Sequence, residues 1–258
     1  MHCHGTPSSR LDAEALARAA ADGGVRLLSP DRPGTGGSAP RPAWSVAGWA
    51  AQAAALADAL GIERFAVSGW SGGGPYALAC AAVLPERVTR VTVVACPAPP
   101  HDTPPGGALR ELNLADRALE RLSIRAPLAA RAIMAPGAAV ARHWPALAAA
   151  LFSSGLSASD RAALAASPLR DMRFVAEAFR QGTEGAVLDY RALGTPWGFD
   201  LADVAAPVTL WHGETDRVVP AAHTPRLAAR LPHADPHVVP GAGHLVLASH
   251  AREIVDAA

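Results

Sequence analysis

Five consecutive residues carry the clearest chemical signal in this sequence: Gly69, Trp70, Ser71, Gly72 and Gly73. They form a G-x-S-x-G pattern between a β-branched run and an Ala-rich run, so we expect a turn that leads from a strand into a helix. Glycines two positions before and after the serine leave room for a strained turn that exposes its hydroxyl. The N–H group of Gly72 would then face an oxyanion at a helix N-terminus, which favours negative charge. A glycine-rich turn with an incidental serine is the alternative interpretation.

Two later loops supply the partners that a serine nucleophile needs. Asp216 follows the predicted strand 207–212, and His244 follows the predicted strand 236–239. A serine hydroxyl is a poor nucleophile until a histidine accepts its proton, and a carboxylate holds that histidine in the correct tautomer. The sequence therefore predicts Ser71 as the nucleophile, His244 as the base and Asp216 as the acid that orients the base.

Other acidic and histidine side chains compete for these roles. Asp31 lies in a turn and is expected to be structural, while Asp200 and Asp203 precede the strand 207–212 and are reserve candidates for the acid. His250 is expected to be a solvated or capping side chain in the last helix. His212 is expected to make a structural hydrogen bond at the end of its strand.

The sequence favours chemistry without a metal or cofactor. His2, Cys3 and His4 superficially resemble a metal-binding cluster, but adjacent residues of an extended strand point to opposite faces and cannot converge on one ion without distortion. We therefore predict no metal site. The sequence also contains no lysine, which excludes a Walker-type phosphate loop, a pyridoxal Schiff base and a Ser-x-x-Lys acyl enzyme.

Composition narrows the class of protein. The chain has 258 residues, half of them hydrophobic, with 23 basic and 23 acidic side chains and a formal net charge of zero. This length suits one sizeable domain, and the hydrophobic content excludes an intrinsically disordered chain. The neutral balance gives no electrostatic case for binding to nucleic acid or to an anionic membrane, so the expected partner is a small molecule.

The cysteines and the apolar stretches bear on the location of the protein. Three cysteines are too few for a disulfide framework. We find neither a signal peptide nor an apolar stretch of ~20 residues, so we expect a cytoplasmic protein.

Short β-branched runs alternate with long Ala-rich runs, an order that predicts an α/β fold with a mostly parallel sheet and flanking helices. The expected strands span residues 25–30, 64–69, 88–95, 207–212 and 236–239, and the expected helices beside them span 44–60, 75–84 and 245–258. No strand pattern appears between about residues 97 and 206, where helical patterns span 109–122, 127–133, 138–151, 159–166 and 171–181. We therefore expect a core of residues 1–96 and 207–258 with an inserted all-helical cap, or lid, of residues 97–206.

Taken together, these features resemble an α/β-hydrolase-fold serine hydrolase with a helical cap. In that family the nucleophile, acid and base follow in the order found here, Ser71, Asp216 and His244. Residues 4–7 (HGTP) resemble the family's HGxP oxyanion loop, and residues 31–38 (DRPGTGGS) resemble its D-x-x-G-x-G-x-S turn. The resemblance implies that the backbone N–H groups of Thr6 and Gly72 form the oxyanion hole.

The activity implied by this resemblance is cleavage of a small or medium ester-, lactone- or amide-like carbonyl substrate through an acyl-enzyme. Related enzymes that cleave carbon–halogen bonds or epoxides carry an aspartate at the position of Ser71, the nucleophile in the strand-to-helix turn. The serine found here therefore argues against both activities. Trp70, Phe152 and Phe199 are candidates to line the substrate pocket, with packing between cap and core as an equal alternative for Phe199. A non-catalytic or truncated relative that binds a small molecule is the other interpretation of the whole chain.

The start of the chain departs from the family pattern. In the family, two strands and a full third strand inside the sheet precede the HGxP loop, whereas only Met1, His2 and Cys3 precede it here. Three residues reach about 10 Å, and a typical strand has about five or six residues. We expect so short a strand to leave its two neighbours, residues 25–30 and 64–69, partly unpaired and to loosen Thr6. The expectation is that the native reading frame begins roughly 25 residues upstream.

Overall fold

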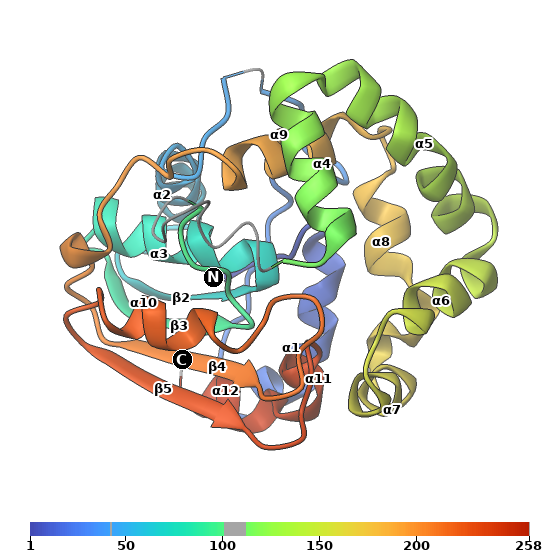
Figure 1. Cartoon of the computed structure of the whole chain (residues 1–258). Helices are drawn as coiled ribbons and strands as arrows, with labels where there is room; N and C mark the ends of the chain where they lie inside the picture. The colour runs from blue at the N-terminus through green and yellow to red at the C-terminus, as the bar shows by residue number, and fades with distance from the viewer. Residues whose placement is uncertain (42, 101–111, 258) are drawn as a thin grey trace.

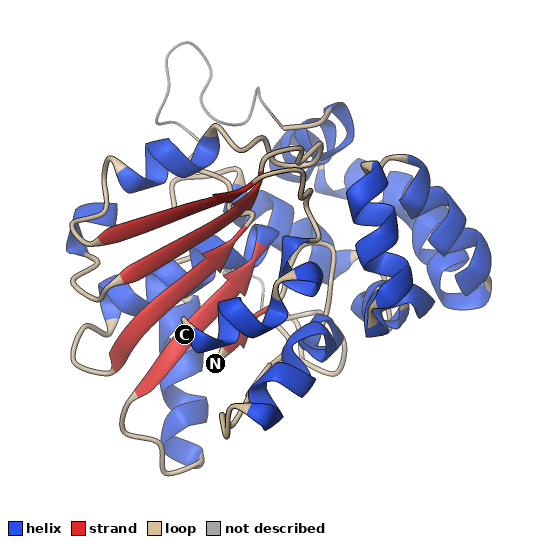
Figure 2. Cartoon of the chain, turned by 90° about the horizontal axis from the view of Figure 1, so that it is seen from below, coloured by secondary structure: helices blue, strands red, loops and turns tan. Residues whose placement is uncertain are grey.

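A computed structural model describes residues 1–41, 43–100 and 112–257, so the beginning of the predicted helix 109–122 lies outside the described residues. Within them, one sheet of five parallel strands in the order β1-β2-β3-β4-β5 confirms the predicted α/β fold (Figures 1 and 2). The strands are β1 (His2–Cys3), β2 (Phe65–Trp70), β3 (Val88–Val94), β4 (Val208–Gly213) and β5 (Ala234–Val239).

The central strands owe their position to their apolar, β-branched side chains. In β2, β3 and β4 most residues are buried, as expected for parallel strands that are covered on both faces. Val67 lies opposite Val91, and Val91 lies opposite Val208, so one row of valines crosses the middle of the sheet. Because all the strands are parallel, their carboxyl ends meet at one edge, where the loops after β2, β4 and β5 come together.

Helices cover both faces of the sheet (Figure 1). One face carries α2 (Trp49–Ala59), α3 (Gly74–Val83) and α10 (His223–Ala228). The other carries α1 (Glu14–Asp22), α11 (Val246–Ser249) and α12 (Ala251–Asp256). The predicted helix 245–258 is thus split in two at His250, whose carbonyl accepts the hydrogen bond from Ile254 N–H that begins α12.

A second group of helices, which we call the cap helices, lies across the top centre and the right of Figure 1. It comprises α4 (Leu114–Arg125), α5 (Pro127–His143), α6 (Pro145–Ser154), α7 (Ala158–Ala166), α8 (Arg173–Ala178) and α9 (Glu184–Leu193). Helix α9 was not predicted from the sequence. Helix α5 continues through Pro136, where the sequence predicted a break, and the chain breaks instead at Trp144, because a residue before proline is forced out of the helical region.

The N-terminal segment differs from the expectation in two ways. Strand β1 lies at the edge of the described sheet and pairs with β2 alone, with His2 opposite Ser68. Residues 25–30 do not form the predicted strand. His2 N–H donates to the Leu28 carbonyl, but β1 has only two residues, which is too short for a regular series of hydrogen bonds between the two segments. The edge of β2 is nevertheless occupied, because the Met1 amino group donates to the Ala66 carbonyl at 2.6 Å.

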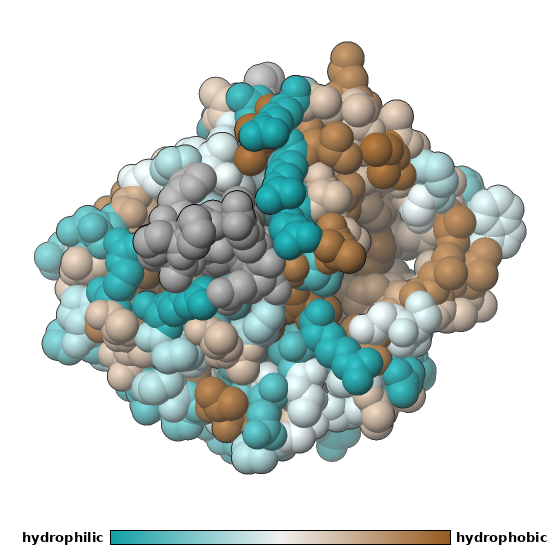
Figure 3. Space-filling model, viewed as in Figure 1, coloured by the Kyte–Doolittle hydropathy of each residue, from teal (hydrophilic) through white to brown (hydrophobic). Residues whose placement is uncertain are grey.

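The outer surface of the cap helices is apolar in places. Exposed side chains gather on α5, α6 and the turn between them, and brown patches mark this part of the surface in Figure 3. They are Leu128, Ile133, Trp144, Leu147 and Leu151. No helix in the described part of the chain is both long enough and apolar enough to cross a membrane.

Candidate active site

The turn after β2 holds Ser71 in a strained conformation. Ser71 has a φ of 53°, in the left-handed region that side chains other than glycine rarely adopt, and it opens a single 3-10 turn ahead of α3. A Cβ atom at Gly69 would overlap the Gly73 backbone, and a Cβ atom at Gly73 would overlap the carbonyl oxygen of Cys3. Both glycines are therefore required by close backbone contacts, which is the steric reason that the G-x-S-x-G pattern predicted.

The loops after β4 and β5 bring Asp216 and His244 into direct contact. His244 Nδ1 lies 2.8 Å from Asp216 Oδ2, and both side chains are buried. The other carboxylate oxygen of Asp216 accepts hydrogen bonds from the N–H groups of Val218 and Val219, at 2.8 and 3.0 Å. His212 Nε2 approaches Asp216 Oδ2 at 3.3 Å. The Asp216 carboxylate is thus held by two backbone N–H groups and His212, and it orients the His244 imidazole through Nδ1.

These contacts oppose the effect of burial on both groups. Burial alone would raise the pKa of Asp216, but His244 and His212 hold it well below its usual value. Burial alone would lower the pKa of His244, but the Asp216 carboxylate outweighs that effect and raises it, with further contributions from Asp160 and Asp116. The pair is therefore an ionised carboxylate beside an imidazole with an increased affinity for a proton.

The loop of residues 4–7 lies directly beside the turn that carries Ser71. A Cβ atom at Gly72 would stand 2.8 Å from Thr6 Oγ1 and 2.9 Å from Thr6 Cβ, so only glycine allows this approach. The backbone of Gly72 and the residue predicted as the second oxyanion donor are thus neighbours. Thr6 and Ser71 also line the same pocket.

A buried ion pair between Arg32 and Asp189 is hydrogen-bonded to the loop of residues 4–7. The Arg32 guanidinium, which is fully buried, donates to Asp189 Oδ2 at 2.6 Å, to the Gly5 carbonyl at 2.7 Å and to Thr6 Oγ1 at 2.9 Å. Tyr76 O–H donates to the other oxygen of Asp189 at 2.9 Å. Burial opposes both charges, but their attraction raises the pKa of Arg32 and lowers that of Asp189. A carboxylate of the cap helices is thereby tied to the predicted oxyanion loop.

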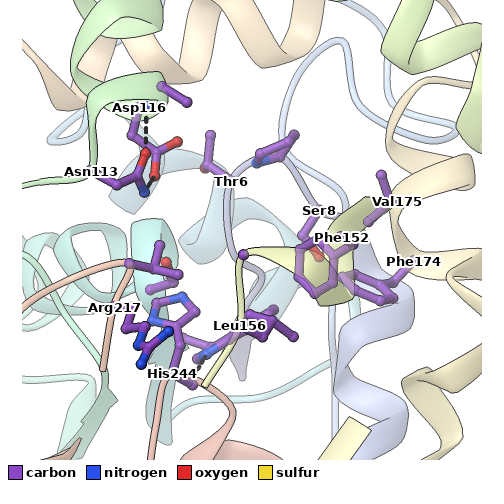
Figure 4. A pocket seen from close by; sticks show the side chains of 16 residues that line it. Thr6, Ser8, Asn113, Asp116, Phe152, Leu156, Phe174, Val175, Arg217 and His244 are labelled. Carbon is purple, nitrogen blue, oxygen red and sulfur yellow. Dashed lines mark hydrogen bonds between the residues drawn. The ribbon is translucent and has the colours of Figure 1, made fainter. Parts of the chain in front are cut away.

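A cavity of about 470 Å³ opens between the core and the cap helices over Ser71 and His244. Its wall is apolar on one side, where Phe152, Phe174 and Val175 converge from α6 and α8 (Figure 4). The lining residues are Thr6, Pro7, Ser8, Trp70, Ser71, Asn113, Ala115, Asp116, Phe152, Gly155, Leu156, Phe174, Val175, Arg217, Val218 and His244.

The opposite side of the cavity is polar. There Asn113 Nδ2 donates to Asp116 Oδ2 at 2.7 Å, and Arg217 points inward beside His244 (Figure 4). Tyr190 O–H donates to the other oxygen of Asp116 at 2.7 Å. A ligand in this cavity therefore meets aromatic rings on one side and an amide, a carboxylate and a guanidinium on the other.

Comparison with known proteins agrees with this arrangement. Residues 2–257 match the model of a family described as the alpha/beta hydrolase family. The chain belongs to the α/β hydrolase family. An alpha/beta hydrolase fold protein from Nakamurella multipartita is 25% identical, with a TM-score of 0.67 over 99% of this chain and 91% of that one. A bromoperoxidase from Bacillus anthracis is 21% identical, with a TM-score of 0.73 over 99% of this chain and 88% of that one.

One curated protein is more similar over a short stretch. The homoserine O-acetyltransferase of Leifsonia xyli subsp. xyli (strain CTCB07) is 59% identical over 51 residues. The match spans 19% of this α/β hydrolase and only 12% of the acetyltransferase, so it compares a small part of the two chains.

Of the residues predicted to bind substrate, two line the cavity and one does not. Trp70 lines it, and its Nε1–H donates to the His244 carbonyl at 3.0 Å, so its ring supports the histidine loop as well. Phe152 lines it and contacts Phe174 edge to face. Phe199 lies outside the lining of this cavity. It stacks on Trp197, and the segment after α9 packs against the core, which is the alternative given for this residue.

The competing residues have structural partners. Asp31 accepts hydrogen bonds from the backbone of Arg10 and Gly37 and pairs with the Arg10 side chain, and Asp200 caps the turn that contains Asp203 and pairs with Arg230. None of the three acids lines the cavity. His212 makes the expected structural hydrogen bond at the end of its strand, to the Val219 carbonyl at 2.8 Å, and it also supports Asp216.

Within the described ranges, no group of three or more His, Cys, Asp or Glu side chains is arranged to hold a metal ion. His2 pairs with the Ser68 hydroxyl at 2.9 Å. His4 donates from Nδ1 to the Gly5 carbonyl and accepts the Arg32 N–H at Nε2, so both of its ring nitrogens are occupied within this α/β hydrolase.

Sequence reasoning missed several polar residues of the site because their partners are remote in the chain. Arg32 stands in the recognised 31–38 turn, but Asp189 follows 157 positions later in a helix that was not predicted. Asp160 reaches the loop of His244 across 85 positions. No local spacing in the sequence marks Asp116 or Arg217 as lining the cavity.

Proposed function

We propose that this α/β hydrolase is a serine hydrolase that cleaves a small or medium ester-, lactone- or amide-like substrate through an acyl-enzyme. The observation that most supports the proposal is the 2.8 Å contact between His244 Nδ1 and Asp216 Oδ2 beside a cavity that Ser71 also lines. The combination is the one that nucleophilic catalysis by serine needs.

The proposed reaction proceeds in two halves. Ser71 Oγ attacks the carbonyl carbon while His244 Nε2 accepts its proton, and the N–H groups of Gly72 and Thr6 stabilise the tetrahedral oxyanion. The imidazolium then gives the proton to the leaving alcohol or amine as the C–O or C–N bond breaks. Water repeats the sequence on the acyl-enzyme and releases the acid. Asp216 stays ionised throughout and keeps Nδ1 protonated, which leaves Nε2 free to act as base.

The shape of the cavity supports an apolar group on one side of the reacting carbonyl. Phe152, Phe174 and Val175 would hold this group, while Asn113 and Arg217 would face the polar remainder of the substrate. We propose that the cap, residues 97–206 of the chain, supplies much of this specificity, because eight of the sixteen residues that line the cavity belong to it. A small-molecule substrate with one apolar and one polar end fits this division.

A fluorophosphonate probe tests the proposal. We expect the purified protein to be labelled at Ser71, and the Ser71→Ala variant not to be labelled. A screen of p-nitrophenyl esters of increasing acyl length, lactones and aminoacyl arylamides then identifies the bond cleaved. Absence of labelling in a folded protein would instead favour a non-catalytic relative that binds a small molecule. Loss of activity in Asp203→Asn, with retention in Asp216→Asn, would move the acid to the segment before β4.

A further inference from the structure

Asp160 is a buried carboxylate on a cap helix that the proposed reaction does not use. It lies in the first turn of α7 and is 1% exposed. Oδ2 accepts a hydrogen bond from the Ser157 hydroxyl at 2.8 Å, and Oδ1 accepts one from Leu245 N–H at 2.7 Å. The first contact belongs to the helix cap, whereas the second crosses from α7 to the loop after β5.

Both neighbours of His244 touch this carboxylate. Leu245 donates its N–H to Oδ1, and a Cβ atom at Gly243 would overlap the carboxylate, so glycine is needed there for the approach. Asp160 therefore lies against the backbone on either side of the predicted base. Capping of α7 does not explain this contact, because Ser157 already caps that helix by accepting the Asp160 N–H at 3.1 Å.

The hydrogen-bond partners of Asp160 are neutral. Among the described residues, the partners of its oxygens are a hydroxyl and a backbone N–H, and no arginine pairs with it. A buried carboxylate without a cationic partner is costly, unless a nearby group can take up positive charge. His244 is such a group, since its imidazole becomes positively charged in the proposed reaction.

The other charged groups around His244 belong to three elements. Asp216 holds its Nδ1, with His212 behind that carboxylate, and Arg217 follows on the same loop. Asp116 faces the cavity from α4. Asp160 approaches from α7 and contacts the backbone on either side of His244, so a second carboxylate, besides Asp216, adjoins the histidine loop.

We propose that Asp160 is a positioning residue for His244. Its hydrogen bond with Leu245 N–H fixes the histidine loop, and its negative charge stabilises the imidazolium form of His244. Its role in turnover rests on the proposed function, whereas its effect on the charge of His244 does not. In agreement with this role, the Asp160 carboxylate is among the groups that raise the pKa of His244.

The decisive variant is Asp160→Asn, which keeps an acceptor oxygen for Leu245 N–H and removes the charge. The midpoint of His244 titration is measured by NMR, with the resonance assigned by its absence in His244→Gln. Removal of a negative charge favours the neutral imidazole, so we expect the midpoint to fall by about one pH unit. Asp171→Asn, which removes an exposed carboxylate from the same part of the chain, should leave it unchanged. An unchanged midpoint in Asp160→Asn overturns the proposal.

Labelling of Ser71 by a fluorophosphonate separates this inference from the proposed function. The pH midpoint of the labelling rate should fall in Asp160→Asn by the same amount as the NMR midpoint. Asp160→Ala, which also loses the bond to Leu245, should be labelled at least tenfold more slowly than Asp160→Asn at high pH. Equal rates in these two variants would refute the positioning role. If wild-type protein is not labelled, the proposed function fails, and the NMR titration still decides whether Asp160 acts on His244.

Discussion

The Arg32–Asp189 pair offers the most quantitative test of how this site is held together. Both side chains are buried, and Asp189 accepts hydrogen bonds from the guanidinium and from Tyr76 O–H. The Asp189→Ala variant leaves the guanidinium buried without a counter-charge. Breaking a buried pair from one side costs about 3–5 kcal/mol of unfolding free energy. For a chain of this size 1 kcal/mol corresponds to about 2–4 °C, so Tm should fall by roughly 6–20 °C.

The double variant Arg32→Met/Asp189→Leu distinguishes stability from positioning. Replacing both charges by apolar side chains of similar size is often neutral or stabilising, so we expect unfolding free energy to return to within about 2 kcal/mol of wild type. Activity should not return, because the carbonyl of Gly5 and the hydroxyl of Thr6 have lost their donor. We expect turnover to remain about 10- to 100-fold low, a smaller loss than the roughly 10²–10³-fold caused by removing an oxyanion donor outright.

Urea unfolding and the rate of Ser71 labelling measure the two effects on the same protein samples. Asp58→Ala is the matched control, since it breaks the 2.7 Å pair with Arg87, in which the aspartate is largely exposed. Its expected cost is at most about 1 kcal/mol, with no change in labelling. A loss below about 1 kcal/mol in Asp189→Ala, or full activity in the double variant, would refute the reasoning about the buried pair.

The Ser71 turn and the cavity allow three further tests. Ser71→Ala and His244→Ala should each abolish turnover, and the double variant should lose little more activity than either single variant, because the groups act as a unit. Steady-state rates of p-nitrophenyl ester hydrolysis measure these losses. Gly73→Ala should prevent folding or lower Tm strongly, because its Cβ would overlap the backbone of β1; circular dichroism melting measures this. Phe152→Ala should shift preference toward longer acyl chains in the ester screen, whereas Phe199→Ala should lower Tm and leave that preference unchanged.

Local patterns predicted the parts of the structure that depend on neighbouring residues. The β-branched runs became β2, β3 and β4, and the glycines around Ser71 proved necessary because the turn packs against backbone. Asp216 and His244 could be placed because each follows a strand, and parallel strands bring their carboxyl ends together. Their contact at 2.8 Å is observed, while their roles in turnover stay predictions.

Features that depend on remote contacts were missed or misjudged. Residues 25–30 have a strand-like sequence, but a strand also needs a partner of sufficient length, and β1 provides two residues. Pro136 suggested a helix end, yet α5 continues through it, because Ala130, Met134, Ala138 and Ala141 keep one buried face on either side of the proline. Phe199 looked like a pocket residue from its type and position, but side-chain packing, which the sequence does not display, placed it against Trp197.

The two long-range carboxylates suggest what the cap helices contribute beyond a pocket wall. Asp189 on α9 reaches the loop of Thr6 through Arg32, and Asp160 on α7 reaches the loop of His244 through Leu245. The loop of Thr6 and the loop of His244 are thus each connected by hydrogen bonds to a buried carboxylate of the cap helices. Displacing the cap would break the ion pair between Arg32 and Asp189 and the hydrogen bond from Leu245 N–H to Asp160. The position of the cap and the geometry of the two loops are therefore coupled, so a substitution on α7 or α9 can reduce turnover without touching the substrate.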